Sequence, residues 1–161
     1  MLYPHEVFAA VYEASPALFK KVFLGPEGSE GLRKYWRRQR RQPWVQQHPA
    51  LQGKSWKYAV PIGIHADKGQ HIKRDKILVI SWSSCMSIAP TAWSKILFSI
   101  LPSEFEVPGV SAEELYAVLV WSLDVLASGV WPSADHNGKP WPYGSRRWAL
   151  AGKRLAGQTL I

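Results

Sequence analysis

KYAVPIGIHADKGQHIKRDKILVISWSS, residues 57–84, is the stretch that decides the fold. Its two apolar runs, residues 59–64 and 77–82, are rich in Ile and Val, the composition typical of β-strands. We expect strands over about 57–66 and 76–83. The connector between them is too long for a two-residue hairpin turn and suits a functional loop.

Asp67 follows the first apolar run, so we expect it at the carboxyl end of the first strand. A strand end is a rigid base for a catalytic or metal-binding carboxylate. Cations follow at Lys68, Lys73 and Arg74, and would place Asp67 in a partly open site at the mouth of a basic hairpin. The plain alternative is an Asp67 that only forms a salt bridge. Lys73 and Arg74 are candidates for nucleic-acid contacts.

Composition limits the class of protein. With 161 residues, 47% of them apolar, the chain can fold as one domain with a core and is too apolar to be disordered. The net charge of +8 favours an anionic partner, nucleic acid before a membrane surface, although a merely soluble basic surface is the alternative. Nine Trp serve a core or a base-stacking surface equally well. We expect no signal peptide and no membrane helix.

Residues 29–42, SEGLRKYWRRQRRQ, predict an amphipathic basic helix with Leu32 and Trp36 on its apolar side. Such a helix suits phosphate contacts, nuclear import or an anionic membrane; a solvated charged face is the alternative. The nucleic-acid-binding candidates on it are Arg33, Lys34, Arg37, Arg38, Arg40 and Arg41. Two helices are expected before it over 4–24, the second capped by Ser15 and ended at Gly25.

The second half of the chain predicts one more strand and one long helix. Residues 92–100 are ambiguous between strand and helix, and strand is favoured; Pro102 and Pro108 would bound a loop after it. Residues 111–128 begin with the capping-box spacing at Ser111 and are apolar nearly all round, so we expect a helix buried on several sides. Its one interior charge, Asp124, is either exposed or paired with an Arg, or it is a metal or proton-transfer group.

The tail is rich in turns. Asn-Gly at residues 137–138 predicts a tight turn, which explains Asp135 without a metal. Arg146 and Arg147 belong to a second basic cluster and complete the nucleic-acid-binding candidates. Cys85 is the only cysteine, so it excludes an internal disulfide and an all-cysteine zinc site, fits a reducing compartment, and is expected to be a small buried residue.

Four motifs together carry a resemblance over residues 57–157: PIGIHAD followed by ILVISWSS, then WSLDVLASGVWP with ADHNGKP. They resemble uncharacterised open reading frames expanded in dinoflagellate-type protists. Those resemble decayed cut-and-paste (DDE) transposases with a ribonuclease H-like domain. The implied fold is α+β, an incomplete ribonuclease H-like three-stranded sheet with a long buried helix, preceded by N-terminal helices.

In the transposase family, two Asp and one Glu hold two divalent metals for phosphodiester chemistry. Asp67 matches the first of these by position. The chain departs from the pattern at the other two, for which Asp75, Asp124 and Asp135 are substitutes that no spacing demands. The resemblance implies Mg²⁺ only if a metal site is complete, with Asp67 and Asp124 as its candidate ligands.

We therefore expect a transposase-derived nucleic-acid-binding fragment, binding DNA or RNA, without catalysis of its own. The expected organisation is a helical basic region over 1–43, a linker over 44–56 and an α/β core over 57–161. The expected location is intracellular, with the nucleus as one candidate compartment. A protein partner or a missing C-terminal half is a further candidate partner. Two alternatives stay open: a protein-interaction module with Trp-lined grooves, and a metal-dependent nuclease using Asp67.

Overall fold

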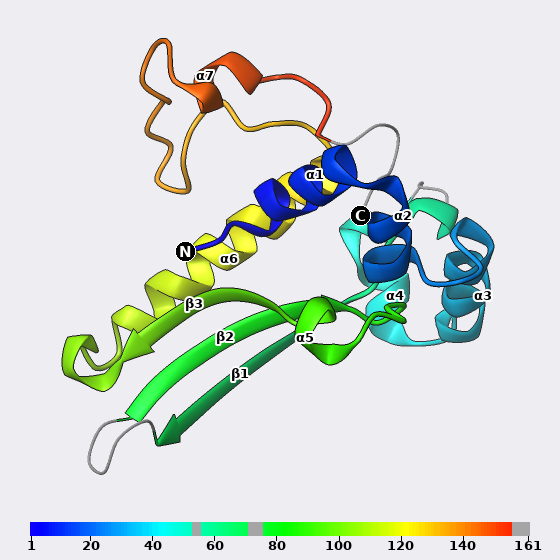
Figure 1. Cartoon of the computed structure of the whole chain (residues 1–161), viewed down its shortest axis with the longest axis horizontal. Helices are drawn as coiled ribbons and strands as arrows, with labels where there is room; N and C mark the ends of the chain where they lie inside the picture. The colour runs from blue at the N-terminus through cyan, green and yellow to red at the C-terminus, as the bar shows by residue number, and fades with distance from the viewer. Residues whose placement is uncertain (53–55, 71–75, 156–161) are drawn as a thin grey trace.

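The structure is a computed structural model that describes residues 1–52, 56–70 and 76–155. Three strands, β1 (Ile62–Gln70), β2 (Lys76–Ser84) and β3 (Ile96–Pro102), form one antiparallel sheet in the order β1-β2-β3 (Figure 1). The predicted pairing of the first two strands is confirmed, with Ile62 opposite Ser84 and Gln70 opposite Lys76. The mixed α/β class is also confirmed, whereas the ribonuclease H-like assignment stays a prediction.

The segment over residues 92–100, which the sequence left ambiguous between strand and helix, contains both a helical turn and a strand. One helical turn, α5 (Thr91–Ser94), precedes β3, and a 3₁₀ turn (Ser103–Phe105) follows it. Pro102, expected to bound the loop after this segment, ends β3 opposite Ile77. A proline is tolerated at the end of a strand because no further ladder bond needs its missing N–H.

The N-terminal helices are α1 (Pro4–Ala14), α2 (Pro16–Phe19), which continues as a π-helical turn (Lys20–Leu24), and α3 (Ser29–Gln39). The predicted cap is confirmed, since the Ser15 hydroxyl accepts a hydrogen bond from Leu18 N at 3.2 Å. Gly25 ends the second helix with a φ of 74°; a Cβ there would lie 2.5 Å from the carbonyl oxygen of Met86. Only glycine fits both constraints.

Residues 44–56, expected as a loop or linker, contain short helical turns. They include most of α4 (Pro43–Gln47) and a 3₁₀ turn (Pro49–Leu51), and a further 3₁₀ turn (Trp56–Tyr58) leads into β1. Val45 and Leu51 are buried with Trp36 and Ala59 in a small second core. The segment is therefore packed against α3. The proposed division of the chain at residues 43 and 56 stays a prediction.

The long helix α6 (Ser111–Ser128) has the predicted bounds and ends at Gly129, whose φ is 70°. The predicted capping box is wrong, because the Ser111 hydroxyl accepts from Val107 N at 2.9 Å, outside the helix. Burial on several sides is also wrong, since Tyr116 and Val120 are exposed. The sheet and α1 cover only one side of α6. The residues buried there are Val118, Leu119, Ser122, Val125 and Leu126.

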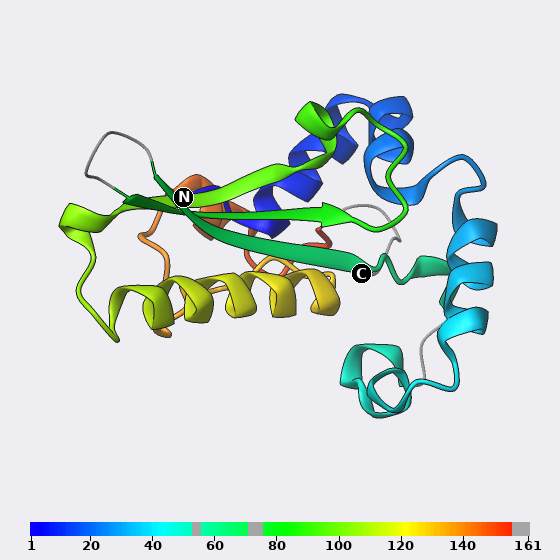
Figure 2. The same ribbon diagram turned by 90° about the horizontal axis from the view of Figure 1, so that it is seen from below.

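The main core lies where α6 runs along one face of the sheet, with α1 beside it (Figures 1 and 2). Ile80 and Trp82 of β2 and Phe98 of β3 point into this core, where Trp82 stacks on Phe23. The N-terminal segment also touches the sheet, since Leu2 N donates to the Phe98 carbonyl at 3.0 Å. The first and second halves of the chain therefore share one core.

The segment after α6 loops out, carries α7 (Arg146–Leu150), and returns to the end of α6. Its predicted Asn-Gly turn is confirmed: Gly138 has a φ of 77° and its N–H donates to the Asp135 carbonyl. The Asp135 carboxylate accepts from Asn137 N and Lys139 N at 3.0 and 2.9 Å. Turn chemistry thus accounts for Asp135.

Candidate nucleic-acid interface

Helix α3 turns its basic side outward. Leu32 is fully buried, Trp36 is 5% exposed, and Trp36 Nε1 donates to the Ala59 carbonyl at 2.6 Å. These contacts fix the rotation of the helix about its axis, and the predicted amphipathic helix is confirmed over Ser29–Gln39. It is three residues shorter than predicted, since Arg40 caps α3 and Arg41 lies in the turn after it. All six basic candidates of this segment are exposed: Arg33, Lys34, Arg37, Arg38, Arg40 and Arg41.

Two of these six charges have a local partner. Arg33 lies 3.6 Å from Glu30, and Lys34 lies 2.7 Å from Glu27. Surface pairs of this kind stabilise by roughly 0–1 kcal/mol and leave the groups accessible. The remaining cations form no ion pair within the described part of the chain: Arg37, Arg38, Arg40 and Arg41.

Four uncompensated arginines at one helix end repel one another. The carboxyl end of the helix dipole offsets part of that repulsion, because Arg37 and Arg38 lie in the last turn of α3. A polyanion would remove the rest, and each phosphate contact would also release a condensed counterion. The end of α3 is therefore a cationic surface that attracts anions.

Asp67 does not lie at the end of its strand, which corrects the prediction. β1 continues to Gln70, and Asp67 is paired within the ladder opposite Val79. Backbone pairing decided this, because the hairpin ladder extends past the apolar run into polar residues. The side chain is exposed in a shallow hollow on the sheet, with His65 and Lys95 also lining it. The neighbouring Lys68 is paired with Glu106 at 2.5 Å.

Asp124, the second metal candidate, lies on the exposed side of α6 and lines a different hollow, beside Trp121 and Ser128. The structure therefore does not bring Asp67 and Asp124 to one site. Asp75 lies outside the described residues. Over residues 1–52, 56–70 and 76–155, no three His, Cys, Asp or Glu side chains gather closely enough to hold a metal ion.

The second basic cluster is separated from the first. In both views α7, with Arg146 and Arg147, lies far from α3 (Figures 1 and 2). Lys73 and Arg74 lie outside the described residues. The candidate cations therefore do not form a single stripe over the part of the chain that the structure describes.

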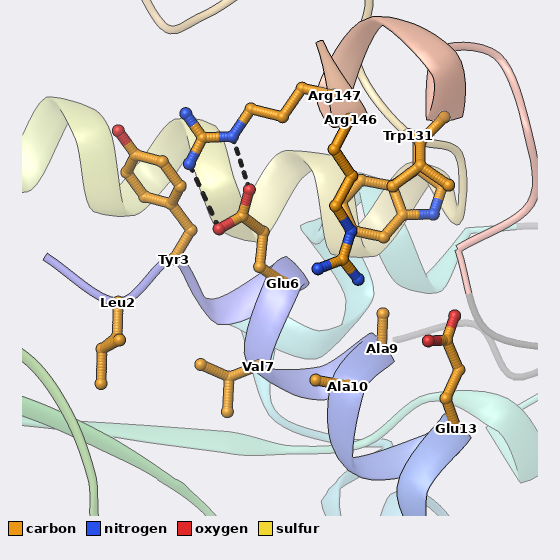
Figure 3. Close-up of a pocket in the computed structure, with 11 residues that line it drawn as sticks. Leu2, Tyr3, Glu6, Val7, Ala9, Ala10, Glu13, Trp131, Arg146 and Arg147 are labelled. Atoms are coloured by element: carbon orange, nitrogen blue, oxygen red, sulfur yellow. Dashed lines mark hydrogen bonds and ion pairs between the residues drawn. The ribbon is translucent and has the colours of Figure 1, made fainter.

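Arg147 is engaged in contacts within the chain, with its side chain half-buried. Its Nε donates to Glu6 Oε1 at 2.7 Å and its Nη2 to Glu6 Oε2 at 3.3 Å, a bidentate pair drawn in Figure 3. The guanidinium also lies 4.9 Å from the ring centre of Tyr3 and 5.0 Å from that of Trp141. The hydrogen bonds with Glu6 raise the pKa of Arg147. This residue ties the tail to α1, a role its sequence context did not indicate.

A cavity of about 410 Å³ opens beside this ion pair, between α1 and the α7 segment (Figure 3). Arg146 and Glu13 line it in addition to Glu6 and Arg147. The lining thus carries two charges of each sign. That balance does not favour a polyanion, so the interface on α3 is the stronger candidate.

A buried polar pair was missed by the sequence analysis. His5, 1% exposed, has its Nδ1 2.7 Å from the hydroxyl of Ser122, which is fully buried. Tyr3, Trp121 and Trp131 surround the imidazole. Burial lowers the pKa of His5 to about 4, with Glu6 opposing that shift and Arg147 adding to it. With no access to solvent, the pair is a structural link between α1 and α6 rather than a nucleophile and its base.

Cys85 is exposed, contrary to the expected burial, because it follows the last residue of β2 and lines a groove beside α3.

Among the described residues, no helix combines the length and the apolarity needed to cross a membrane.

No protein family, curated protein or solved structure matches this chain. The resemblance to decayed transposases therefore stays a prediction from the motifs of residues 57–157.

Proposed function

We propose that this protein binds nucleic acid, and that the carboxyl end of α3 is its principal phosphate-binding surface. One observation carries the proposal: four exposed arginines lie at the carboxyl end of a helix anchored by buried Leu32 and Trp36, with no acidic partner among the described residues. Arg37 and Arg38 are in the last turn of α3, and Arg40 and Arg41 follow it directly. Guanidinium groups are well suited to phosphate oxygens, because their planar fork of N–H donors matches the phosphate geometry.

The transposase-derived origin and a nuclear location belong to the same proposal. The first rests on the motif resemblance. The second rests on the density of cations in α3, since a short Lys/Arg-rich segment is typical of a nuclear import signal. A nucleic-acid-binding role without catalysis is consistent with the separation of Asp67 from Asp124.

The test compares two variants of equal charge. The four-arginine variant carries Arg37→Gln, Arg38→Gln, Arg40→Gln and Arg41→Gln. The control variant carries Lys20→Gln, Lys21→Gln, Lys95→Gln and Lys139→Gln, four exposed lysines elsewhere on the surface. Each set of four replacements lowers the formal charge from +8 to +4. Binding to a labelled oligonucleotide is followed by fluorescence anisotropy as salt is increased.

We expect the parent to bind with a salt-dependent affinity and the control to keep most of its slope. The four-arginine variant should lose roughly 0.7–0.9 in the slope of log K against log salt for each phosphate contact removed, about 3 if all four make contact. Equal losses in both variants would show that net charge, and not α3, drives binding. Absence of salt-dependent binding by the parent would refute the function itself.

A further inference from the structure

An aromatic groove of about 250 Å³ lies between α3, α4 and the start of β1. Tyr35, Trp36 and Trp44 line it from the helical side, and Pro61, Ile62 and Ile64 from the side of the strand. The groove is smaller than the roughly 300–1,000 Å³ of ordinary small-molecule pockets and is open at the surface. Its size and its aromatic lining suit a single planar ring.

Trp44 is the exposed aromatic residue of this groove. Pro43 begins α4 immediately before Trp44. The Trp44 ring makes an edge contact with the Trp36 ring, at 6.0 Å between ring centres and 68° between planes. Trp36 is in turn held by its hydrogen bond to Ala59. Half of Trp44 nevertheless remains exposed. A large ring held by packing and still open to solvent can receive a stacking partner with little loss of side-chain entropy.

The charge around the groove favours an anionic ligand. No acidic residue is among the described residues that line it. No arginine lines the groove itself, but Tyr35 lies one helical turn from Arg38 and Trp44 follows Arg41 by three residues. The chain therefore places two of the four arginines close to aromatic residues of the groove. Aromatic rings beside a basic surface are the combination that single-stranded nucleic-acid sites use: cations follow the backbone while bases stack on rings.

We infer that the groove binds a base of a single-stranded nucleic acid, stacked on Trp44, while the arginines of α3 hold the flanking phosphates. The inference rests on the proposed function and names its substrate as unpaired strands. Bases inside a duplex already stack on their neighbours and do not offer their faces, whereas unpaired bases do. A duplex could therefore use the arginines but not the groove.

The experiment uses three probes of equal length, about 12 nucleotides, within the range that one such site covers. They are an oligothymidine, an oligomer with the same sugar–phosphate backbone and no bases, and a duplex. Affinities are measured by anisotropy for the parent, Trp44→Ala, Trp44→Phe, the four-arginine variant and Trp93→Ala. Trp93 is a matched control, since it is 66% exposed but does not line the groove.

We expect the parent to bind oligothymidine more tightly than the abasic oligomer or the duplex. Trp44→Ala should weaken oligothymidine binding on the order of tenfold, within the range for loss of one base–aromatic stack, and leave the abasic oligomer unchanged. Trp44→Phe should restore most of the loss, and Trp93→Ala should have no effect. The four-arginine variant should weaken binding to all three probes.

Equal binding of oligothymidine and the abasic oligomer by the parent would overturn the base site. Unchanged oligothymidine affinity in Trp44→Ala, or a preference for the duplex, would do the same. If one of these results occurs and the four-arginine variant still loses binding, the phosphate interface is supported while the base site is refuted. The groove would then be a candidate site for a peptide instead of a base. Failure of the parent to bind any probe would instead refute the proposed function. A circular dichroism melt of each variant confirms that it is folded.

Discussion

The buried His5–Ser122 pair makes a quantitative prediction about stability and pH. In the native state His5 is enclosed by Tyr3, Trp121 and Trp131, and burial lowers its pKa to about 4. In the unfolded chain the same imidazole returns to its ordinary pKa of about 6.5. Between these values the unfolded state binds a proton that the native state does not, so stability falls as the pH falls.

The size of this pH effect on the free energy of unfolding follows from the pKa shift of His5. One pKa unit corresponds to about 1.4 kcal/mol, so the whole contribution of His5 is about 3 kcal/mol, present above pH 6.5 and lost by about pH 4. Integrating the linkage relation from about pH 7 to pH 5 gives a loss of about 2 kcal/mol. Most of the pH range from 6.5 to about 4 lies above the ordinary pKa values of Asp and Glu, roughly 3.9–4.3. Titration of the carboxylates therefore contributes little to the pH dependence of stability in this range.

Urea unfolding followed by tryptophan fluorescence measures the effect. The free energy of unfolding is determined for the parent and for His5→Asn at several pH values within that window. His5→Asn should be less stable at neutral pH but should lack the part of the pH dependence that His5 supplies. A parent and a variant with parallel stability–pH curves would show that His5 is not held neutral in the core.

Two further predictions concern the core and the chemistry. Leu119→Ala should lower the free energy of unfolding by about 2–5 kcal/mol, since Leu119 is 1% exposed in the main core; a melting temperature equal to the parent's would contradict its placement there. Purified protein should not cleave plasmid DNA with Mg²⁺ or Mn²⁺, because two-metal chemistry needs several carboxylates around the metals and no cluster of three acidic, His or Cys ligands occurs among the described residues. Cleavage by the parent that disappears in Asp67→Asn would overturn that expectation.

Residues close in sequence determined the local elements. The helix over 111–128, the β1–β2 hairpin, the Ser15 cap and the turn at Gly138 were all predictable. Each depends on neighbours within one helical turn, one strand pairing or one tight turn. The outward basic side of α3 was predictable for the same reason, because helical periodicity alone separates its cations from Leu32 and Trp36.

Only the tertiary structure decided which surfaces were covered and which groups met. Tyr116 and Val120 are exposed because the sheet and α1 cover one side of α6, a limit that no property of the helix itself sets. Arg147 pairs with Glu6 across 141 positions, and His5 meets Ser122 across 117.

Such pairs leave no periodic pattern in a single sequence, since they form only when packing brings distant helices together. The groove beside Trp44 arises in the same way. Tyr35 and Trp44 come from neighbouring segments, but the opposite wall of Pro61, Ile62 and Ile64 is brought to them by the fold. Local sequence therefore determined which residues are basic and aromatic near α3, and tertiary packing decided that the aromatic ones border one groove.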